Sequence, residues 1–515
     1  MKQLLHLAIV LYPKKKKKTK MSRKVQEKDI WLGLTYDDVL LVPQRSPVRS
    51  RKDVSTATRL SRNVTLNIPI VASNMDTVTE AEMAIAMARE GGIGILHRFC
   101  SVEEQCKMVE VVKRAQSFKI AKPRGVTPDT TVGTAKAIMQ AGYGSKPGSK
   151  PFRALVVLGE QERFLGIVTV ADMQFAADSA KVRDVMTPAA KLSISNNPDI
   201  TLEEARTVLH ENKVSNVPIV DNATGRLKFL ITAGDVRKIL ANPNACKDSQ
   251  SRLRVGAAVG VKRDDISRAR ALVVAGVDVL VIDIAHGHSD ICIDMIRALK
   301  ADPVTKKVDI IAGNIATRAA AEDLIAAGAD GLKIGVGPGS ICITRIVAGS
   351  GVPQLSALLD ICSYANAKGV PCIADGGVRT SGDIAKAMAA GASTVMLGNS
   401  LSGTDESPGN VLVKDGRKVK IIRGMAGYGA NISKAEKEQA EVEEVFLDMV
   451  PEGVEGVVPY KGPVGPIIKQ LVGGLRSGIS YCGARNLEEM REKSVFVRMT
   501  SSGLKESAHH DISKM

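Results

Sequence analysis

The sequence predicts an α/β protein, a (β/α)8 barrel interrupted by a smaller α+β insert. Short apolar runs rich in β-branched residues recur along the chain, each followed by an Ala-rich segment with helical periodicity. This alternation is typical of parallel strands covered by helices. Eight such runs occur, which favours a closed barrel over an open doubly wound sheet. The 515 residues, 44% hydrophobic but only 3% aromatic, suit a large aliphatic core and more than one domain.

The regular alternation stops between the second and the third run, where an insert is expected. We therefore divide the chain into a basic extension (1–27), a first barrel segment (28–118), the insert (119–248), a second barrel segment (249–500) and a tail (501–515). The eight expected strands are residues 68–73, 92–96, 254–259, 279–283, 309–313, 331–335, 370–375 and 394–398.

The insert contains an internal repeat. One half ends FLGIVTVADM (164–173) and the other LKFLITAGDV (227–236), so that a strand precedes a Thr-x-x-Asp turn in both. We expect each turn, Thr169/Asp172 and Thr232/Asp235, to open a helix. The aspartate can accept hydrogen bonds from ribose hydroxyls, and the threonine can reach a phosphate at the helix start. Simple helix capping is the alternative.

The repeat resembles a tandem pair of cystathionine-β-synthase-type (CBS) modules, which commonly bind adenine or guanine nucleotides. Two copies in matching positions favour a regulatory nucleotide site over capping alone.

A second irregular stretch, residues 404–462, follows the eighth strand and is polar, charged and Gly-rich. It is too long for an idle connection, so a mobile flap over the active site is predicted, with a surface excursion as the alternative.

The formal charge of +16 is partly local, because seven lysines and no acid lie in residues 1–20. No basic stripe interleaved with aromatic residues occurs elsewhere, which argues against a dedicated nucleic-acid surface. The eight cysteines form no CxxC pair, so neither a zinc site nor a disulfide framework is indicated, and a reducing compartment is favoured.

The terminal segments carry weaker signals. The apolar residues 4–12 are too short to span a bilayer, and their lysine cluster lies on the wrong side for a secretory signal. Met21 would make a sensible start, so we expect the preceding residues to have no folded role. Ser513-Lys514-Met515 differs by one conservative change from the peroxisomal address S-K-L, which predicts import into a peroxisome-type organelle, with the cytoplasm as the alternative.

Polar and small residues follow the expected strands, and parallel barrel strands deliver such residues to one rim. Cys342 lies in the loop GVGPGSICITR (335–345), where it has little packing to do; a small buried cysteine in a turn is the alternative. Cysteine is the most nucleophilic ordinary side chain at neutral pH, so covalent catalysis is indicated. The strand-end residues are Asn74, Met75, Asp76, Asp283, His286, His288, Asn314, Ser340, Cys342, Thr344, Asp375, Gly376, Gly377, Gly398 and Asn399.

The glycines after the seventh and eighth strands, together with Gly339-Ser340, offer backbone N–H groups to a phosphate, and Asp375 is placed to accept hydrogen bonds from sugar hydroxyls.

The chain resembles the IMP dehydrogenase/GMP reductase family over residues 28–500, CBS insert included. The matching motifs are LTYDDVLLVP (34–43), MDTVTEAEMAIAMAREGGIGILH (75–97), RVGAAVG (254–260), DIAHGHS (283–289), AGNIAT (312–317), GPGSICITR (337–345), IADGGVRTSGDIAKAMAAGA (373–392) and VPEGVEGVVPYKGP (450–463).

The resemblance implies a purine nucleotide whose C2 is attacked by Cys342. Its phosphate would lie on the Ser340, Gly377 and Gly398 loops and its ribose on Asp375. Glu452 matches a position that contacts the base edge, where a carboxylate can accept from N1–H and shuttle a proton. The further substrate-binding positions implied are Ser73, Asn74, Met75, Gly376, Asn399, Gly424 and Met425.

The resemblance also implies a nicotinamide cofactor stacked beside the base. Asp283, His286, Ser289 and Asn314 are the matching cofactor positions. A monovalent cation such as K+ is implied on the backbone carbonyls of Gly337, Gly339 and Cys342. The family likeness also suggests a homotetramer, with an octamer formed through the insert as an extension.

Two reactions share the covalent adduct, and the flap separates them. The dehydrogenase branch hydrolyses the adduct with a flap Arg-Tyr pair, but residues 433–450 contain neither Arg nor Tyr. Residues 74–77, NMDT, also look reductase-like, whereas AHGHS (285–289), VPEGVEG (450–456) and the CBS insert favour the dehydrogenase. Ile422 and Asn399 depart from the family pattern at phosphate contacts.

The absence of the Arg-Tyr base from residues 433–450 is the strongest of these signals, and it favours the reductase branch. The sequence therefore predicts NADPH-dependent reductive deamination of GMP to IMP and ammonia, with Cys342, Thr344 and Glu452 as the catalytic residues. An NAD-dependent IMP dehydrogenase that uses a different base is the first alternative. A catalytically weak nucleotide sensor that works through the CBS pair is the second.

Overall fold

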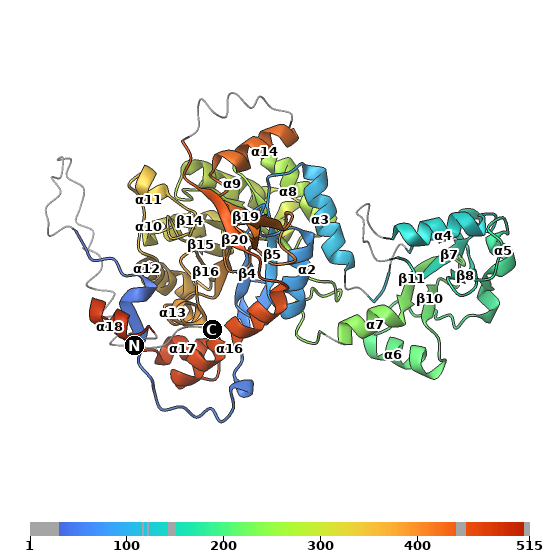
Figure 1. The fold of residues 1–515 in the computed structure, drawn as a ribbon, viewed down its shortest axis with the longest axis horizontal. Helices are drawn as coiled ribbons and strands as arrows, with labels where there is room; N and C mark the ends of the chain where they lie inside the picture. The colour runs from blue at the N-terminus through green and yellow to red at the C-terminus, as the bar shows by residue number, and fades with distance from the viewer. Residues whose placement is uncertain are drawn as a thin grey trace. The chain divides into compact units, whose positions relative to one another are not determined.

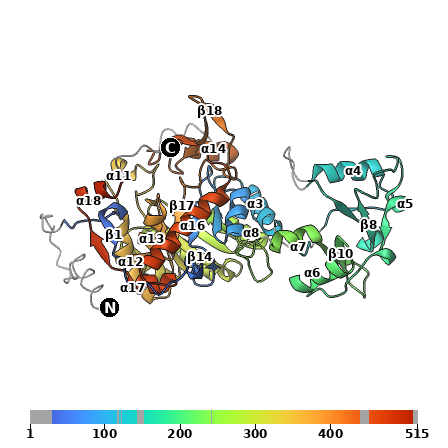
Figure 2. The same ribbon diagram turned by 60° about the horizontal axis from the view of Figure 1, so that its bottom comes forward.

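The computed structural model describes residues 30–115, 118–120, 123–142, 151–240, 242–438 and 450–508. Its chain divides into two compact units, drawn in Figure 1 and, turned, in Figure 2. One unit combines Met1–Ala115 with Asn244–Met515, and the other is Gln116–Pro243. The predicted extension 1–27 and the terminal Ser-Lys-Met lie outside the described residues.

The larger unit contains a closed parallel barrel of eight strands, which confirms the predicted fold class. Sequence neighbours pair around the barrel, and β17 closes it on β4 with Leu397 opposite Ala72. β5 pairs with β12 although the insert separates them in sequence. The barrel strands are β4 (Ile70–Ala72), β5 (Ile93–Leu96), β12 (Gly256–Val259), β13 (Val279–Asp283), β14 (Asp309–Ile315), β15 (Gly331–Ile334), β16 (Cys372–Asp375) and β17 (Thr394–Leu397).

Three of the barrel helices, α3, α10 and α13, begin at a residue whose side chain accepts a hydrogen bond from a backbone N–H of the first turn. Ser101 and Glu104 form a reciprocal capping box at α3, and Thr380 with Asp383 does the same at α13. Gly91 and Gly328 end α2 and α10 in the left-handed conformation that favours glycine. The barrel helices are α2 (Ala81–Glu90), α3 (Val102–Arg114), α8 (Asp264–Ala275), α9 (Asp290–Ala301), α10 (Arg318–Ala327), α12 (Gln354–Ala367), α13 (Ser381–Ala389) and α16 (Val464–Tyr481).

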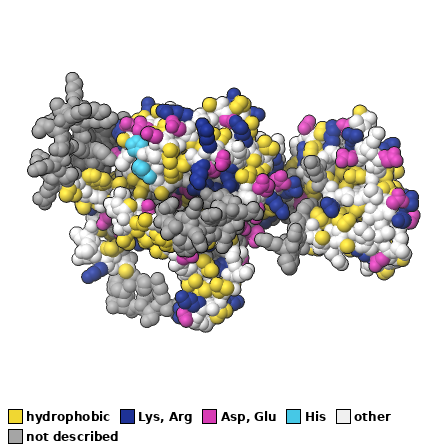
Figure 3. Space-filling model, turned by 90° about the horizontal axis from the view of Figure 1, so that it is seen from above, with side chains coloured by type: hydrophobic (Ala, Val, Ile, Leu, Met, Phe, Trp, Pro, Cys, Tyr) yellow, Lys and Arg dark blue, Asp and Glu magenta, His cyan; other side chains and the backbone are white. Residues whose placement is uncertain are grey.

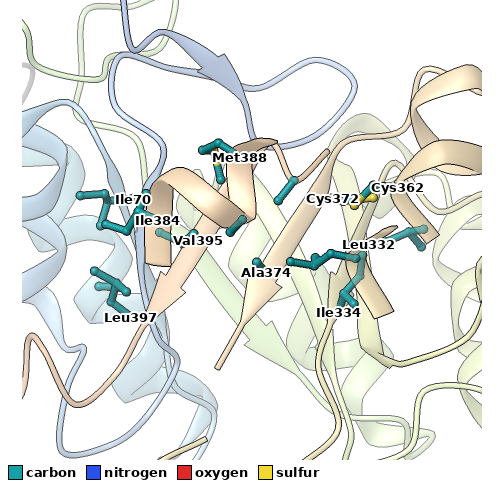
Figure 4. Packing of buried hydrophobic residues seen from close by; sticks show 14 of the residues in the cluster. Ile70, Leu332, Ile334, Cys362, Cys372, Ala374, Ile384, Met388, Val395 and Leu397 are labelled. Carbon is teal, nitrogen blue, oxygen red and sulfur yellow. The ribbon is translucent and has the colours of Figure 1, made fainter. Parts of the chain in front are cut away.

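The strands bury both faces, which explains why they read as continuous apolar runs. Ile70 belongs to the core cluster between strands and helices, whereas the next residue, Val71, belongs to the cluster that also contains Ile93, Val281 and Met396 from other strands. Figure 4 shows Ile70 and its neighbours packed among strands and helices. Alternate residues therefore fill two separate apolar layers.

The flap contains more regular structure than the polar sequence suggested. β18 (Leu412–Lys414), β19 (Arg417–Arg423) and β20 (Glu455–Pro459) form an antiparallel sheet, and α14 (Tyr428–Glu438) follows β19. Within residues 433–450, the stretch that corresponds to the dehydrogenase Arg-Tyr pair, residues 439–449 lie outside the described residues.

Short elements complete this unit. They are β1 (Val39–Leu41), which pairs with β21 (Phe496–Arg498), the hairpin of β2 (Thr58–Arg59) and β3 (Thr65–Leu66), α11 (Thr344–Val347), α17 (Leu487–Lys493), α18 (Ser501–Glu506), and the 3-10 turns Tyr36–Asp38, Arg51–Asp53 and Thr305–Lys307. Within the part of the chain that the structure describes, no helix has the length and apolar character needed to cross a membrane.

The insert has its own cores and an antiparallel hairpin in each half, β7 with β8 and β10 with β11. Its strands are β6 (Gly125–Val126), β7 (Ala154–Leu158), β8 (Phe164–Thr169), β9 (Thr187–Pro188), β10 (Asn216–Val220) and β11 (Leu227–Thr232). Its helices are α4 (Val132–Ala141), α5 (Val182–Val185), α6 (Leu202–Glu211) and α7 (Ala233–Leu240), with 3-10 turns at Glu160–Glu162 and Ala189–Lys191.

One expectation for the insert was wrong. The Thr232 turn opens α7, but the Thr169 turn leads into successive turns and no helix. The segment after Thr169 contacts another helix instead: the carbonyls of Asp178 and Ala180 accept hydrogen bonds from the backbone N–H groups of Gly133 and Val132 at the start of α4. Its backbone therefore supplies acceptors to the first turn of α4.

Candidate active site

The predicted rim residues follow barrel strands that all run in the same direction, so their loops meet at one end of the barrel. Hydrogen bonds link neighbouring loops. Ser73 N donates to Leu397 O at 3.0 Å, and Lys461 Nζ donates to Asn399 O at 2.6 Å. Figure 3 shows this end of the molecule, where histidine side chains lie at the surface beside acidic ones.

The predicted catalytic residues form a continuous hydrogen-bonded chain. Cys342 Sγ lies 3.2 Å from Thr344 Oγ1, and Thr344 Oγ1 donates to Glu452 Oε2 at 2.7 Å. Cys342 and Thr344 come from the loop after β15, whereas Glu452 lies 108 residues beyond Thr344 in the flap. All three side chains thus join one path along which a proton can move between sulfur and carboxylate.

Backbone pairing holds the flap against the cysteine loop. Ile343 N donates to Glu452 O at 2.8 Å, and Val454 N donates to Ile341 O at 2.9 Å. Gly424 N donates to Val454 O at 3.1 Å, so the predicted Gly424 position lies beside the same strand of the flap. A Cβ on Gly424 would lie 3.0 Å from the Gly453 backbone, so glycine permits this close approach.

Two glycines of the loop after β16, where phosphate and sugar binding are predicted, adopt backbone conformations that other residues avoid. Gly376 has φ 93° and Gly377 has φ 79°. A Cβ on Gly376 would come within 3.0 Å of Gly339 N, so the loop after β16 lies against the loop that carries Ser340. Gly398 lies close to Met75 in the same way, with 2.9 Å between a Cβ there and Met75 Sδ. The loops after β15 and β16 are therefore neighbours, and phosphate binding by them stays a prediction.

Sequence reasoning missed Lys333, a 2% exposed lysine in β15. Its ammonium donates to Asp283 Oδ1 at 2.8 Å, to Asp375 Oδ2 at 3.1 Å and to Asn314 Oδ1. Burial by itself would lower the pKa of Lys333, but the two carboxylates raise it well above its ordinary value. A lysine in the middle of an apolar run, GLKIG (331–335), was the available signal.

The same lysine controls the carboxyl at the predicted cofactor position. Burial favours the neutral form of Asp283, but Lys333, together with the charge of Arg98 and a hydrogen bond from Asn74, holds the pKa of Asp283 below its ordinary value. Arg98 follows β5 and was also missed by sequence reasoning. The rim therefore combines ionised carboxylates with buried cations.

An ion pair joins the flap to the loop after β4. Arg423 Nε donates to Asp76 Oδ2 at 3.0 Å, and Arg423 Nη1 donates to Gly429 O at 3.0 Å. Burial opposes the charge, yet Asp76 raises the pKa of Arg423 above its ordinary value. The predicted substrate position Met425 is held nearby, because its sulfur accepts from Asp76 N at 3.4 Å.

The remaining cofactor positions fit a polar ligand. Ser289 precedes α9, and its Oγ is buried without a hydrogen-bond partner among the described residues. His286 is exposed, and His288 Nε2 lies 2.9 Å from Asp323 Oδ2. A buried hydroxyl without a partner is costly, so Ser289 has a free hydrogen bond to offer.

In the insert, the predicted nucleotide residues contact each other. Thr169 Oγ1 donates to Asp172 Oδ2 at 2.8 Å, and Thr232 Oγ1 donates to Asp235 Oδ2 at 2.7 Å. The matched contacts show that the two turns share one hydrogen-bonded geometry, which is also the geometry of capping, so the nucleotide site stays a prediction.

The cation site also stays a prediction. At its expected position, Gly337 has φ 84° and Gly339 O accepts from Cys342 N at 3.2 Å.

A closed parallel barrel with a polar rim at its strand ends places the chain in the class of (β/α)8-barrel enzymes. The IMP dehydrogenase / GMP reductase domain model matches residues 33–510. The chain therefore belongs to the IMP dehydrogenase/GMP reductase family, as the motifs predicted.

Relatives in both branches of the family are similar to the chain over nearly its whole length. A GMP reductase of Leishmania donovani is 63% identical over 94% of this chain and 98% of that protein. An inosine-5'-monophosphate dehydrogenase of Nitrosopumilus maritimus is 48% identical over 93% and 98%.

Among solved structures, a GMP reductase variant of Trypanosoma brucei in complex with guanosine 5'-monophosphate has 60% identity and a TM-score of 0.89, covering 94% of this chain and 99% of that one. The enzyme from the same organism in complex with guanosine 5'-triphosphate has 54% identity and a TM-score of 0.78, covering 92% and 99%.

Proposed function

We propose that the protein is a GMP reductase, which converts GMP to IMP and ammonia with NADPH as the reductant. The hydrogen-bonded chain Cys342–Thr344–Glu452 carries the proposal, because it supplies a nucleophile and a proton path without a separate base for water. The identity of 63% to GMP reductases, against 48% to IMP dehydrogenases, supports the same branch.

Cys342, Thr344 and Glu452 account for the transfer of one proton and for the departure of ammonia. As Cys342 Sγ bonds to purine C2, its proton passes through Thr344 Oγ1 to Glu452. The same path returns a proton to the exocyclic amine, which leaves C2 as ammonia. After hydride addition at C2, the carbon–sulfur bond breaks and the thiolate is regenerated. The flap backbone at Gly424 and Glu452 holds these groups in place.

The residues present fit a nicotinamide cofactor. Asp283, His286, Ser289 and Asn314 would hold it, and the unpartnered hydroxyl of Ser289 is the observation that supports this assignment. When bound, the cofactor supplies the hydride to C2. A monovalent cation at Gly337, Gly339 and Cys342 enters no step of this mechanism.

A paired assay tests the proposal. Purified protein is expected to oxidise NADPH with GMP and to release ammonia, and Cys342→Ala is expected to abolish both while GMP still binds. NADH formation from IMP and NAD, without GMP-dependent NADPH oxidation, would instead assign the dehydrogenase activity. Nucleotide binding without either reaction would favour the sensor alternative.

We further propose that purine nucleotides bind the insert at Thr169/Asp172 and Thr232/Asp235 and regulate the enzyme. The matched geometry of the two turns supports this, as does the GTP complex of the T. brucei relative. ATP, GTP and GMP at millimolar concentration should change the kinetics or assembly state. Unchanged values for all three would contradict regulation.

The terminal Ser513-Lys514-Met515 supports a third proposal, import into a peroxisome- or glycosome-type organelle. A fluorescent fusion that retains the three residues should be imported, whereas the same fusion without them should stay in the cytosol. Equal distribution of the two fusions would contradict the proposal.

A further inference from the structure

One buried cation connects three strand ends of the barrel. Lys333 on β15 contacts Asp283 at the end of β13, Asn314 in β14 and Asp375 at the end of β16. A lysine ammonium has three N–H donors and no acceptor, so these contacts use its whole capacity. Because Lys333 is 2% exposed, water contributes little to holding its charge.

The contacts leave one oxygen of Asp375 free. Lys333 Nζ and Asn314 Nδ2 both donate to Asp375 Oδ2, at 3.1 and 2.9 Å. Among the described residues, no hydrogen bond reaches Asp375 Oδ1. Lysine also fixes the amide of Asn314, because an ammonium can face only its oxygen; Asn314 Nδ2 then donates to Gly335 O at 2.7 Å as well. Asp375 is thus held through its Oδ2 by Lys333 and Asn314.

We propose that Lys333 is a positioning residue that sets the preference for ribonucleotides over deoxyribonucleotides, by holding Asp375 as a carboxylate with Oδ1 directed to the sugar hydroxyls. This inference rests on the proposed function, because it takes the ribose of a purine nucleotide as the ligand of Asp375. Without the ammonium, Asp283 and Asp375 lose their shared counter-ion, and Asp375 Oδ2 loses one of the two donors that orient its carboxyl group. The group can then turn toward other donors, which removes the acceptor that recognises the hydroxyls.

The test compares the binding of GMP, 2′-deoxy-GMP and 3′-deoxy-GMP by calorimetry, so that it does not depend on turnover. The wild-type protein should prefer GMP over at least one deoxy form by about tenfold or more, since a site built for a hydroxyl rejects its absence. Lys333→Met should bind GMP about tenfold more weakly and reduce that preference to about twofold. Lys333→Arg, which keeps the charge, should restore part of it.

A double-mutant cycle tests whether Lys333 acts through Asp375. Asp375→Asn should lose the preference by itself, and adding Lys333→Met should cause little further loss. Lys420→Met is the matched control, because Lys420 is another buried lysine (3% exposed) but donates to the carbonyls of Thr404 and Ser407. It should keep the wild-type preference even where it lowers stability.

Three results would overturn the inference: a wild-type protein without ribose preference, an unchanged preference in Lys333→Met, or additive losses in the double mutant. An unchanged preference includes equal weakening of all three nucleotides, which would assign Lys333 a merely structural role. If Lys333→Met does not fold, Lys333→Gln carries the same expectation. A protein that shows the ribose preference but does not reduce GMP would contradict the proposed function alone.

Discussion

At the residue scale, the hydroxyl of Thr344 stands between the sulfur of Cys342 and the carboxylate of Glu452. Its two contacts measure 3.2 and 2.7 Å, and no other side chain bridges these groups among the described residues. The threonine is therefore the part of the path that can be removed with the least change in shape.

Thr344→Val should lower kcat by about 10²-fold, because the isosteric side chain cannot pass a proton. GMP affinity should change little, so steady-state NADPH oxidation and calorimetry together measure the effect. Thr344→Ser retains the hydroxyl and should keep most of the activity. A valine variant with nearly wild-type kcat would show that protons reach the leaving amine by another path.

The sequence could predict polar residues at the strand ends and in the loops that follow them, because parallel strands deliver such residues to one rim. Cys342, Asp375 and Asn314 were found in this way. Lys333 was not, because it interrupts an apolar run that predicts core packing, and its partners are 19 to 50 residues away. Only closure of the barrel brings these partners around the lysine.

At the element scale, β19 and α14 of the flap meet the loop after β4 through Arg423 and Asp76. The side chain of Asp76 is 6% exposed and that of Arg423 is 21% exposed, so the pair is shielded from water. Screening by salt should therefore weaken this attachment less than a surface ion pair.

Asp76→Asn and Arg423→Met should each raise the KM for GMP by about tenfold, because either change leaves a charge without its partner beside the predicted substrate positions Gly424 and Met425. The double variant should lose less than the sum of the two single losses. Lys418→Met, an exposed site on the same strand β19, is the control and should leave KM unchanged. Strictly additive losses would contradict a direct attachment.

Other elements show why local patterns succeed or fail. Barrel strands are buried on both faces and were predicted from continuous apolar runs. The flap strands were missed because β18 is only three residues long and exposed throughout, and β19 has four basic residues among its seven, RKVKIIR (417–423). The Thr169 turn leads into successive turns, and the carbonyls of Asp178 and Ala180 beyond them accept hydrogen bonds from the first turn of α4, a contact between distant segments that a local pattern does not reveal.

At the scale of the whole molecule, both points where the chain leaves and re-enters the barrel unit are fixed to one cluster. Lys113, near the end of α3, donates to Asp248 at 3.1 Å and to Asp278 at 2.6 Å. Burial raises the pKa of Asp278 above its ordinary value, although Lys113 opposes this. The barrel unit therefore holds both ends of the insertion with its own side chains.

Replacing residues 116–243 by a short Gly-Ser linker should give a protein that folds and keeps GMP reduction within about threefold, because each unit has a separate core. The truncated protein should lose any response to ATP or GTP. Thermal unfolding and kinetics with and without nucleotide measure both outcomes. A response that survives the deletion would place the regulatory site in the barrel unit.

The distribution of sulfur has a practical consequence for labelling. Six of the eight cysteines are buried, among them Cys362 and Cys372, which contact each other in the core of Figure 4. Cys106 and Cys342 are partly accessible, and burial together with two nearby glutamates raises the pKa of the Cys106 thiol. A mild electrophile added to the native protein should therefore alkylate Cys342 first, and peptide mass mapping would show one modified site. Saturating GMP should protect that site, which gives a count of competent active sites that needs no turnover.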